Sequence, residues 1–383
     1  MPPNPITIGV NTLFFIPSEV GGSETYLRKT LVAMAEQADG DRLVVFTNLE
    51  NHDTLKADLE AFPQVAFVQL KFRAMNRPVR IIREQLELPF KVKSSGVDVL
   101  WSPGYTAPLF APCHQVVSIL DMQYKAFPRD LTFAARLATD FLVKAAARRT
   151  DQIIAISQFS KAEIVRYTSA DARKVEVVYP AASPRFADPL AEDERTRLVG
   201  SLIPDSIPYF LCVAATYPHK NVSALVEAFG QLMDRIPHNL VIVGNARLGE
   251  PEVARALGTI RDPARVIRLK RLSELELVAL YQGCDAFVFP SLYEGFGLPV
   301  LEGLIAGVPV VTTRCASIPE VGGEAAQYFD PEDPAALPAA ILAVKGWSPA
   351  ERQERIQKGR EFARSFSWST TAHGTLKILR AVC

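Results

Sequence analysis

The chain has 383 residues, of which 48% are hydrophobic and 22% charged, a length and composition typical of two or three globular domains. Its 42 Lys and Arg residues balance 42 Asp and Glu residues, which argues against a nucleic-acid-binding protein that relies on net positive charge. Five scattered cysteines without a C-x-x-C pair argue against a disulfide framework or a zinc site, and they favour a cytoplasmic protein with reduced thiols.

The N-terminal segment carries no leader pattern. Met1–Pro5 lacks a basic region, and Gly9 and Asn11 interrupt the apolar run that follows it. No apolar run elsewhere is long enough to cross a bilayer. We therefore expect neither a signal peptide nor a transmembrane helix.

The first half of the chain alternates short apolar runs with amphipathic helical patterns. The runs predict strands at Ile6–Leu13, Leu43–Thr47, Val65–Leu70, Val97–Trp101, Val116–Asp121, Ile153–Ser157 and Val175–Tyr179. Helical periodicity predicts helices at Glu24–Gln37 and Phe133–Arg149. Strands of this kind that alternate with helices indicate βαβ units and a buried parallel sheet.

A glycine pair, Gly21-Gly22, lies between the first predicted strand and the first predicted helix. Glycine lets the backbone approach a ligand closely, because it has no side chain. The motif is a weak one, since a plain tight turn uses glycine in the same way. Both interpretations stay open at this point.

One segment, Lys71–Lys93, is rich in positive charge. Its basic residues are Lys71, Arg73, Arg77, Arg80, Arg83, Lys91 and Lys93. Apolar residues are interleaved with them, and the only acids are Glu84 and Glu87. The pattern fits a basic amphipathic surface that contacts anionic lipid or an anionic acceptor, and it also fits a solvated helix face beside a loop.

The alternation restarts after Pro180–Pro208, a segment that is rich in Pro, Ala and charge. The second half predicts strands at Tyr209–Ala214, Leu240–Val243, Val266–Leu269, Ala286–Phe289 and Pro309–Thr312, and helices at Asn221–Ile236, Ser273–Gln282 and Pro299–Ala306. The chain is therefore predicted to be an α/β protein with two Rossmann-like domains, residues 1–195 and 205–365. A helical pattern in residues 366–383 could close the C-terminal domain or cross back to the N-terminal domain.

The segment from Pro290 to Glu302 connects a predicted strand to a predicted helix. It carries two glycines, Gly295 and Gly297, with Glu294 before them, and Pro299 suits the start of the helix. Exposed amides and the positive end of a helix dipole favour phosphate binding. Glu302 is expected in the first helical turn. In the simplest interpretation it only complements the dipole.

Two further features follow strands of the same half. Lys220 precedes a long amphipathic helix, where the helix dipole mildly disfavours a cation. An anion shared with the helix amides explains this placement, and a surface lysine that reaches into water is the alternative. Gly244-Asn245 ends the next strand and offers another close backbone approach. These features could face one crevice at the carboxyl edge of the sheet.

Several blocks in this order and spacing resemble glycosyltransferase family 4. The blocks are Pro218-x-Lys220-Asn221, Val243-Gly244, Glu294-Gly295-Phe296-Gly297-Leu298-Pro299-x-x-Glu302, Gly307-x-Pro309-Val310 and Ser317-x-Pro319-Glu320-Val321. The two glutamates, Glu294 and Glu302, match the E-x7-E motif of that family. The resemblance implies a retaining, nucleotide-sugar-dependent enzyme of the GT-B fold, with two Rossmann-like domains that face each other across a cleft.

The resemblance also implies roles for individual residues. Lys220 would neutralise the donor diphosphate, Glu302 would hold the ribose hydroxyls, and the loop of Gly21 and Gly22 would close over the diphosphate and the acceptor. The donor sugar would be held by Glu294 and by the backbone of Gly295, Phe296, Gly297 and Leu298. Asp121 would stand on the N-terminal side of the catalytic site, and Gly244 and Asn245 would border the donor. No metal is implied, and the chain has no D-x-D motif.

The chain departs from the family pattern on the N-terminal side. Many relatives have His-Asp at the end of a strand where this chain has Leu120-Asp121. His114 lies earlier on the same run and cannot take the place of the missing histidine without a different backbone path. This departure puts the contribution of the N-terminal domain to catalysis in doubt.

Other departures lie in the C-terminal half. The strand before Lys220 ends in Ala214-Ala215 where relatives commonly have glycine, and the basic neighbour is His219 where relatives often have Arg. Lys270 stands where relatives often have Gly, near the expected nucleobase pocket. These differences concern the choice of donor more than the class of enzyme.

The leading hypothesis is transfer of a hexose from a GDP- or UDP-sugar to a saccharide, a lipid-linked sugar or a small acceptor, in polysaccharide or glycoconjugate synthesis. The protein is expected in the cytoplasm, with a possible peripheral contact at the inner face of the membrane through Lys71–Lys93. Leu120 favours an alternative, a GT-B-type partner protein that binds nucleotide sugar without transferring it. A nucleotide-sugar epimerase is a third interpretation.

Overall fold

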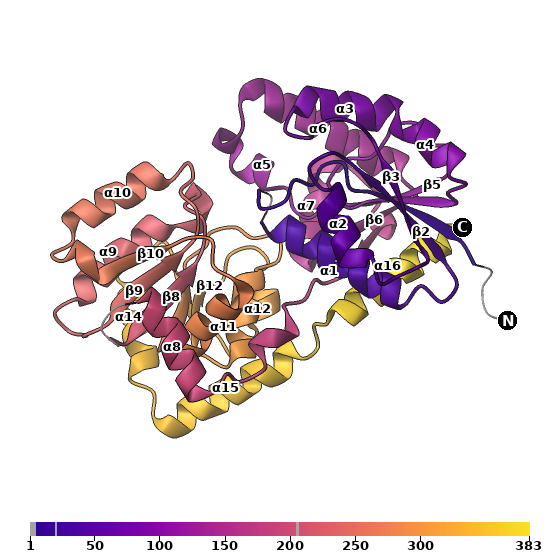
Figure 1. The fold of residues 1–383 in the computed structure, drawn as a ribbon. Helices are drawn as coiled ribbons and strands as arrows, with labels where there is room; N and C mark the ends of the chain where they lie inside the picture. Colours follow the sequence, from indigo (N-terminus) through magenta and orange to yellow (C-terminus); the bar gives the residue numbers. More distant parts are fainter. Residues whose placement is uncertain (1–4, 20, 204–206) are drawn as a thin grey trace. The chain divides into compact units, whose positions relative to one another are not determined.

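The computed structural model describes residues 5–19, 21–203 and 207–383, and these residues form two compact units (Figure 1). The first unit runs to Ala181 and includes Phe366–Cys383, and the second comprises Ala182–Ser365. Residues 182–195 therefore group with the second unit, although the sequence pattern assigns them to the first. Residues 1–4, which belong to the segment expected to carry no leader, and Val20, beside the glycine pair, lie outside the described residues.

The first unit contains a sheet of seven parallel strands in the order β3-β2-β1-β4-β5-β6-β7. The strands are β1 (Thr7–Asn11), β2 (Arg42–Thr47), β3 (Val65–Gln69), β4 (Val99–Ser102), β5 (His114–Ser118), β6 (Gln152–Ala155) and β7 (Val175–Val177). Each of the seven strands predicted in this half is present. Their order reverses between β1 and β4, as in doubly wound α/β folds.

Helices connect and cover the strands of the first unit. They are α1 (Gly22–Glu36), α2 (His52–Leu59), α3 (Arg77–Leu86), α4 (Leu88–Ser94), α5 (Gln123–Ala126), α6 (Phe133–Arg149), α7 (Gln158–Thr168) and α16 (Trp368–Ala381). The last helix returns to this unit from the far end of the chain. Thr371 Oγ1 donates to Tyr179 O at 2.7 Å, and Arg380 binds Asp41 at 2.9 Å. Residues 366–383 therefore cross back to the first unit and do not close the second.

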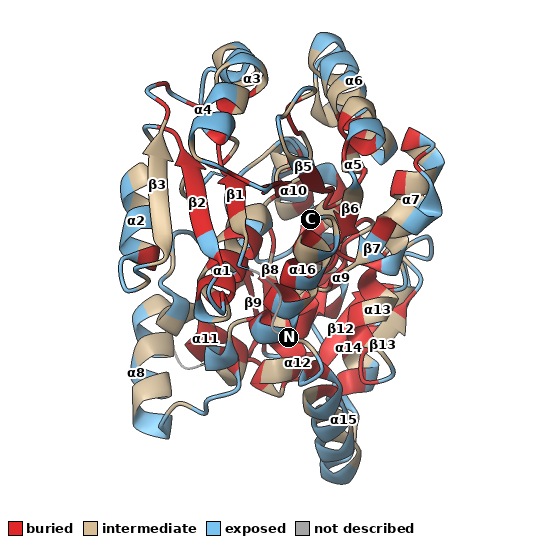
Figure 2. Cartoon of the chain, turned by 90° about the vertical axis from the view of Figure 1, so that its right-hand side faces the viewer, coloured by how far each residue is buried: buried red, intermediate tan, exposed pale blue. Residues whose placement is uncertain are grey.

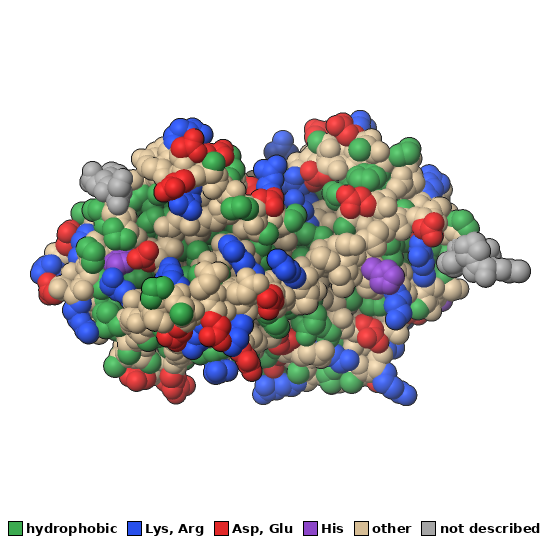
Figure 3. Space-filling model, turned by 90° about the horizontal axis from the view of Figure 1, so that it is seen from below, with side chains coloured by type: hydrophobic (Ala, Val, Ile, Leu, Met, Phe, Trp, Pro, Cys, Tyr) green, Lys and Arg blue, Asp and Glu red, His purple; other side chains and the backbone are tan. Residues whose placement is uncertain are grey.

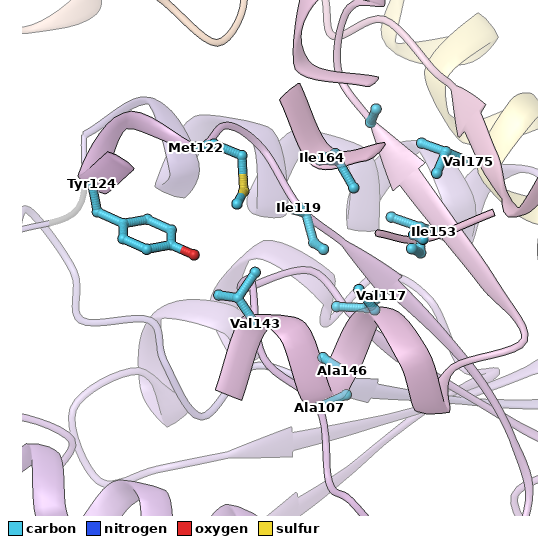
Figure 4. Close-up of a cluster of buried hydrophobic side chains, with 13 residues drawn as sticks. Ala107, Val117, Ile119, Met122, Tyr124, Val143, Ala146, Ile153, Ile164 and Val175 are labelled. Carbon is cyan, nitrogen blue, oxygen red and sulfur yellow. The ribbon is translucent and has the colours of Figure 1, made fainter. Parts of the chain in front are cut away.

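A dry cluster of apolar side chains joins α6 and α7 to the sheet (Figure 4). Val143 and Ala146 of α6 point toward Val117 of β5 and toward Ala107 in a preceding loop. Small side chains at Ala107 and Ala146 let the helix approach the sheet closely. This packing fixes which face of α6 is buried and which face remains outside.

The second unit contains a sheet of six parallel strands in the order β10-β9-β8-β11-β12-β13. The strands are β8 (Tyr209–Val213), β9 (Asn239–Val243), β10 (Val266–Leu269), β11 (Ala286–Phe289), β12 (Val310–Thr313) and β13 (Gln327–Phe329). The first five were predicted. The sixth was missed because a three-residue edge strand is too short to give a periodic signal.

The helices of the second unit are α8 (Glu192–Leu202), α9 (Val222–Leu232), α10 (Glu250–Thr259), α11 (Glu274–Gly283), α12 (Leu298–Ala306), α13 (Ile318–Gly322), α14 (Ala336–Lys345) and α15 (Pro349–Ala363). The central strands of both sheets are buried, and exposed residues lie mainly on helices and loops (Figure 2). In the described residues, no helix combines the length and the apolar character needed to cross a membrane. On the face drawn in Figure 3, cations and anions are interspersed.

The strand order of the second unit also reverses, between β8 and β11. These two strands are hydrogen-bonded neighbours, with Ala286 paired to Phe210 and Phe287 to Leu211. Loops that leave neighbouring strands at such a reversal diverge and open a crevice at the carboxyl edge of the sheet. The loop after β8 carries Lys220, and the loop after β11 carries Glu294. Topology therefore places the two strongest sequence candidates beside each other.

Candidate active site

Lys220 ends a short 3-10 turn (Pro218–Lys220) between β8 and α9. Asn221 follows in the left-handed region, with φ 54° and ψ 33°, and α9 begins at Val222. The turn is tied to the neighbouring loop, because Leu292 N donates to His219 O at 2.7 Å. The lysine therefore stands before a helix N-terminus, as the sequence predicts, and faces the loop that follows β11.

Lys220 and Glu294 form an ion pair. Lys220 Nζ lies 2.6 Å from Glu294 Oε1 and 2.8 Å from Oε2. Both side chains are mostly buried, with 21% of Lys220 and 11% of Glu294 exposed. Ser317 Oγ donates to the Glu294 carbonyl at 2.9 Å, which fixes the backbone from which the carboxylate extends. The site thus combines a cation and a carboxylate that hold each other in place.

The hydroxyl groups of Ser291 and Thr313 hold the loop of Glu294 in place. Ser291 Oγ contacts the His219 carbonyl at 3.2 Å, and Thr313 Oγ1 donates to the Ser291 carbonyl at 2.6 Å. Ser291 and Thr313 are fully buried. Because these bonds link the segments that follow β8, β11 and β12, the loop is rigidly supported.

The backbone from Gly295 to Leu298 leads into α12. Gly297 adopts φ 104° and ψ 44°, a conformation that strains any residue with a Cβ, and it lies immediately before the helix. Phe296 is buried, so a ligand could meet its backbone but not its side chain. Pro299 has no N–H and Val300 N donates to the Gly297 carbonyl at 3.0 Å, so the amide that α12 offers to a ligand in its first turn is that of Leu298. This N-terminus therefore can bind an anion in the way the sequence suggests.

The sequence pattern predicts Glu302 in the first helical turn. In the structure it is the fifth residue of α12 and lies just beyond that turn. Its carboxylate accepts a hydrogen bond from Tyr281 Oη at 3.0 Å. Burial raises the pKa of Glu302 to about 7, and the hydrogen bond from Tyr281 opposes this rise. A group that merely complements a helix dipole lies in the first turn and needs no side-chain partner, whereas Glu302 lies beyond that turn and is bound by Tyr281, which favours a further role.

Tyr281 was not identified from the sequence. It lies on α11 with its side chain fully buried, and a tyrosine at an apolar helical position is typical of a core residue. Only the packing of α11 against α12 shows that its hydroxyl reaches Glu302. The sequence carried no signal that distinguishes this tyrosine from an ordinary core side chain.

Gly244 lies where β8 and β9 end side by side. A Cβ at this position would stand 2.2 Å from the Ala214 carbonyl oxygen and 2.8 Å from Ala215 N. The glycine of this sheet edge therefore follows β9, although relatives often have one at the end of the preceding strand. Asn245 is exposed, and its carbonyl accepts a bond from Thr216 N at 3.1 Å.

His219 does not act as a second cation. Its ring is buried and stacks on Tyr217 with the centroids 5.5 Å apart. Burial, together with the charge of Lys220, lowers the pKa of His219 to about 3. The imidazole is therefore neutral near pH 7, and Lys220 is the charged member of this pair.

A second ion pair lies at the carboxyl ends of β8 and β10. Arg268 binds both carboxylate oxygens of Glu250, which also accepts a bond from Thr216 Oγ1 at 2.9 Å. These contacts lower the pKa of Glu250, chiefly through the hydrogen bond from Arg268. Lys270, two residues after Arg268, is exposed. The sequence pattern points to Lys270 but not to Glu250, because the residues that bind Glu250 lie on other elements of the fold.

In the first unit, Gly21 and Gly22 begin α1. Gly21 is the N-cap residue, with φ 56° and ψ −123°, which only glycine adopts without strain. Both glycines are exposed. Glu24 N donates to the Gly21 carbonyl at 3.0 Å. The pair therefore forms an exposed turn at a helix N-terminus, as the sequence pattern suggests.

Asp121 follows β5 and accepts bonds from Tyr105 Oη and Gln123 N, each at 2.9 Å. Leu120 is 3% exposed, and its carbonyl accepts a bond from Ser160 Oγ at 2.8 Å. Its side chain therefore belongs to the core. His114 begins β5 at the opposite edge of the sheet, so it cannot replace a histidine at position 120.

A buried carboxylate in the first unit was also missed. Glu84 of α3 is 4% exposed and accepts bonds from Asn11 Nδ2 at 2.8 Å and from Thr106 Oγ1 at 3.0 Å. Asn11 also contacts Ser102 Oγ at 3.2 Å. Asn11 and Ser102 end β1 and β4, so Glu84 ties α3 to the point where the strand order reverses. The sequence showed only an acid within a basic segment.

The chain matches two family models, one in each unit. Residues 20–185 match the model described as Glycosyltransferase Family 4, and residues 207–345 match the model described as Glycosyl transferases group 1. Among solved structures, HepE of Anabaena, crystallised with UDP-glucose, has a TM-score of 0.77 and 17% identity over 98% of this chain and 100% of its own. At that identity the likeness shows the fold, the GT-B type.

Several curated relatives are mannosyltransferases. The serotype-specific mannosyltransferase WbdA of Escherichia coli is 29% identical over 270 residues, which are 68% of this chain but only 32% of WbdA. The O-antigen chain mannosyltransferase RfbU of Salmonella typhimurium is 24% identical over 86% of this chain and 89% of its own length. Together with the two matching models, these relatives show that the chain belongs to glycosyltransferase family 4.

Proposed function

We propose that this protein is a retaining glycosyltransferase that moves a hexose from a nucleotide diphosphate sugar to an acceptor. One observation carries the proposal: Lys220 and Glu294 form an ion pair between the loops that follow β8 and β11, where the strand order of the second unit reverses, and the second of these loops leads into α12, which carries Glu302. The family 4 membership supports it. In an open α/β sheet, this position is the usual place for a ligand.

The chemistry of the leaving group fits these residues. Departure of a nucleoside diphosphate builds negative charge on phosphate oxygens and positive charge on the anomeric carbon. Lys220 and the Leu298 amide at the start of α12 would stabilise the first charge, and the carboxylate of Glu294 the second. Glu302, recessed behind the loop, would accept hydrogen bonds from the ribose hydroxyls.

In the first unit, Asp121 and the loop of Gly21 and Gly22 would contribute to the acceptor side of the reaction. Asp121 is held in place by Tyr105 and Gln123, which favours a positioned carboxylate. Gly244 and Asn245 would border the donor in the second unit. These roles extend the family pattern to this chain.

The donor is a GDP- or UDP-sugar, and the acceptor is a saccharide, a lipid-linked sugar or a small molecule. The relatives WbdA and RfbU are named as mannosyltransferases, and RfbU as one that acts on an O-antigen chain. HepE was crystallised with UDP-glucose. These relatives support a place for the chain in polysaccharide or glycoconjugate synthesis. The proposed location is the cytoplasm, because the five free cysteines fit a compartment that keeps thiols reduced.

We propose that the reaction needs no divalent metal, because Lys220 can supply the positive charge that the leaving diphosphate requires. Transfer should therefore continue at an unchanged rate after dialysis against EDTA. A loss of activity that added Mg²⁺ or Mn²⁺ restores would contradict this part of the proposal.

Calorimetric titration with UDP and with GDP tests donor binding directly. The variants are Lys220→Ala and Glu302→Ala, and the matched controls are Lys358→Ala and Glu361→Ala on the exposed face of α15. We expect one nucleotide to bind wild type and both controls equally, and to bind both site variants at least about tenfold more weakly. The assignment is wrong if neither nucleotide binds, or if the site variants bind like wild type.

A second candidate is a partner protein that binds nucleotide sugar without transferring it. The observation that favours it is Leu120, which is buried at the place where many relatives have a histidine. A screen of donor hydrolysis and of transfer to many acceptors separates the two candidates. Transfer to any acceptor establishes the enzyme, and donor binding without turnover establishes the partner protein.

We also propose a peripheral contact with the inner face of the membrane through Lys71–Lys93. The basic residues Lys71, Arg73, Arg77, Lys91 and Lys93 of this segment are exposed, which supports an attraction to anionic lipid. Co-sedimentation with liposomes tests the contact. Equal binding to neutral and anionic vesicles would remove it.

A further inference from the structure

Exposed apolar side chains are concentrated on a small part of the first unit. Of the eleven large apolar side chains that are exposed in the described residues, eight lie on or next to α3, α4 and α6: Met75, Ile82, Leu86, Phe90, Phe110, Phe133, Leu137 and Phe141. Phe90 is 76% exposed and Phe133 73%, although phenylalanine is usually among the most buried residues. Such a concentration marks an interaction site.

The exposed residues follow helical spacing. Ile82 and Leu86 are four residues apart on α3, and Phe90 is exposed on the next helix, α4. Phe133, Leu137 and Phe141 have the same spacing on α6. Residues four apart lie on one face of a helix, so α6 carries one apolar stripe, and Ile82 and Leu86 of α3, extended by Phe90 of α4, form the second. We call these six residues the two-stripe surface.

The opposite faces of the same helices are packed against the unit. Glu84 anchors α3 through Asn11 and Thr106, and Val143 and Ala146 of α6 enter the cluster of Figure 4. The stripes therefore cannot turn inward without breaking these contacts. They are outward-facing because of how the unit is built.

A short loop connects the two stripes. Gln85 of α3 donates to Ala107 O at 3.2 Å and accepts a bond from Leu109 N at 2.9 Å. Phe110 follows in this loop, and the guanidinium of Arg149 at the end of α6 lies 5.2 Å from its ring centroid. In both Figures 1 and 2, α3 and α6 lie at the same end of the first unit. The stripes thus belong to one continuous side of the protein.

The charges around the stripes are predominantly positive. The acids of α3, α4 and α6 are engaged: Glu84 is buried, Glu87 binds Arg83, and Asp140 binds Lys125 and Lys144. Exposed cations remain at Arg77, Lys91, Lys93, Arg148 and Arg149. Two copies of so basic a surface would repel each other, whereas an anionic bilayer is complementary to it in both charge and polarity.

We infer that the two-stripe surface inserts into the interface of an anionic lipid bilayer, with α3 and α6 lying on the membrane and their cations bound to headgroups. The inference rests on the proposed membrane contact of Lys71–Lys93 and deepens it in two ways. It adds α6, which lies outside that segment, and it makes apolar insertion part of the attachment. Binding should therefore outlast the screening of charge by salt.

The test uses the full chain and vesicles of phosphatidylcholine with about 30% phosphatidylglycerol. The stripe variant carries Phe133→Ser, Leu137→Ser and Phe141→Ser, and the matched control carries Leu248→Ser and Phe362→Ser, both exposed in the second unit. We expect the partition coefficient of the stripe variant to fall at least about tenfold and that of the control to change less than about twofold. A stripe variant that binds like wild type overturns the inference.

Insertion itself has a spectroscopic signature. Phe133→Trp should shift its fluorescence emission to the blue when vesicles are added, and Leu248→Trp should not. An emission unchanged by bound vesicles overturns insertion, since the charges alone would then hold the protein. A wild-type dimer that the stripe variant converts to a monomer in lipid-free sedimentation overturns it as well, because a second copy would then cover the surface.

This inference and the proposed function fail in different experiments. UDP and GDP binding is measured without lipid, and the stripe residues lie outside the candidate active site, so the stripe variant should retain wild-type nucleotide affinity. Unchanged vesicle binding by this variant removes the inference and leaves glycosyl transfer intact. Lys220→Ala tests the reverse case. If it loses nucleotide binding but binds vesicles normally, the active-site assignment and membrane insertion are independent of each other.

Discussion

Lys220 Nζ lies within 2.8 Å of both carboxylate oxygens of Glu294, so the two residues that connect the loops after β8 and β11 form one ion pair. The two hydrogen bonds hold both side chains in a single geometry, against the side-chain entropy that each loses. The ion pair also couples them, because removing one partner leaves the other partly buried and uncompensated. Removing either side chain should therefore disturb the other, whereas Glu294→Gln keeps an oxygen that can still accept a hydrogen bond from Lys220.

Mutations of this pair should separate nucleotide binding from turnover. Lys220→Ala should weaken nucleotide binding about 10- to 100-fold, because a charge-assisted bond to the diphosphate is lost. Glu294→Gln should change UDP or GDP affinity less than about threefold, since its proposed contact is with the sugar, but it should lower turnover at least about 100-fold. Calorimetry and a single-turnover assay measure the two effects. Equal losses of nucleotide affinity in both variants would contradict the assigned roles.

The bond from Tyr281 to Glu302 should set the pH dependence of nucleotide binding. Burial raises the pKa of Glu302 to about 7 and Tyr281 lowers it, so the ionised carboxylate that accepts ribose hydroxyls becomes dominant as the pH rises through 7. Wild-type affinity should increase over this range. Tyr281→Phe should bind about 3- to 10-fold more weakly at pH 7 and recover at higher pH, because the pKa of Glu302 rises further.

Tyr209→Phe provides the control for this experiment. Tyr209 is also buried, and its hydroxyl donates to Leu280 O at 2.8 Å on the same helix as Tyr281, but it does not contact Glu302. Its loss should leave the pH profile of binding unchanged. A Tyr281→Phe profile that matches wild type would show that the hydroxyl does not act through Glu302.

Glu302 should also reduce stability at high pH. Its folded-state pKa, about 7, is above the ordinary value of 4.5, so the fold favours the protonated form and loses this stabilisation as the pH rises through 7. By linkage, Glu302→Gln should be more stable than wild type, and its advantage should be ~2 kcal/mol larger at pH 8.5 than at pH 5.5. Urea unfolding at both values measures the difference. An advantage independent of pH would indicate a carboxylate with an ordinary pKa.

The contact between Gly244 and Ala214 should be sensitive to a single methyl group. A Cβ on Gly244 would meet backbone atoms that no rotamer change can move, so Gly244→Ala should destabilise the protein by at least ~2 kcal/mol. Gly258→Ala, on the exposed side of α10 with open space around it, should be neutral or stabilising by up to ~1 kcal/mol. Thermal unfolding of both variants tests this contrast. Similar melting temperatures would show that β8 can move away from Gly244.

Restoring the histidine of relatives should not restore a function. Because Leu120 is buried, Leu120→His would place an imidazole in an apolar site at a cost of about 2–4 kcal/mol. We expect a lower melting temperature and no gain of transferase activity, whereas Leu120→Met should differ little from wild type in both. A stable Leu120→His variant with severalfold higher activity would show that the imidazole ring can reach the donor. It would also show that Leu120 limits the activity of the wild-type protein.

Much of the fold could be predicted from the sequence because parallel strands carry a local signal. Strands such as Val99–Ser102 and Ala286–Phe289 are continuous apolar runs, and each alternates with a helix of clear periodicity. Elements without such a signal were missed. β13 is three residues long, and the polar helix α15 buries few of its residues. No local sequence pattern indicates that residues 182–195 belong to the second unit.

The sequence by itself determined the fold class, the family and the proximity of Lys220 to Glu294, because short motifs at strand ends meet at one sheet edge. Only the tertiary structure decided how these residues are held. It brought Tyr281 to Glu302, made His219 neutral, buried Leu120 and grouped the exposed stripes of α3 and α6. The physical reason is that hydrogen bonds and burial depend on elements distant in the chain. Periodicity and spacing report which face of an element is apolar, but not what that face meets.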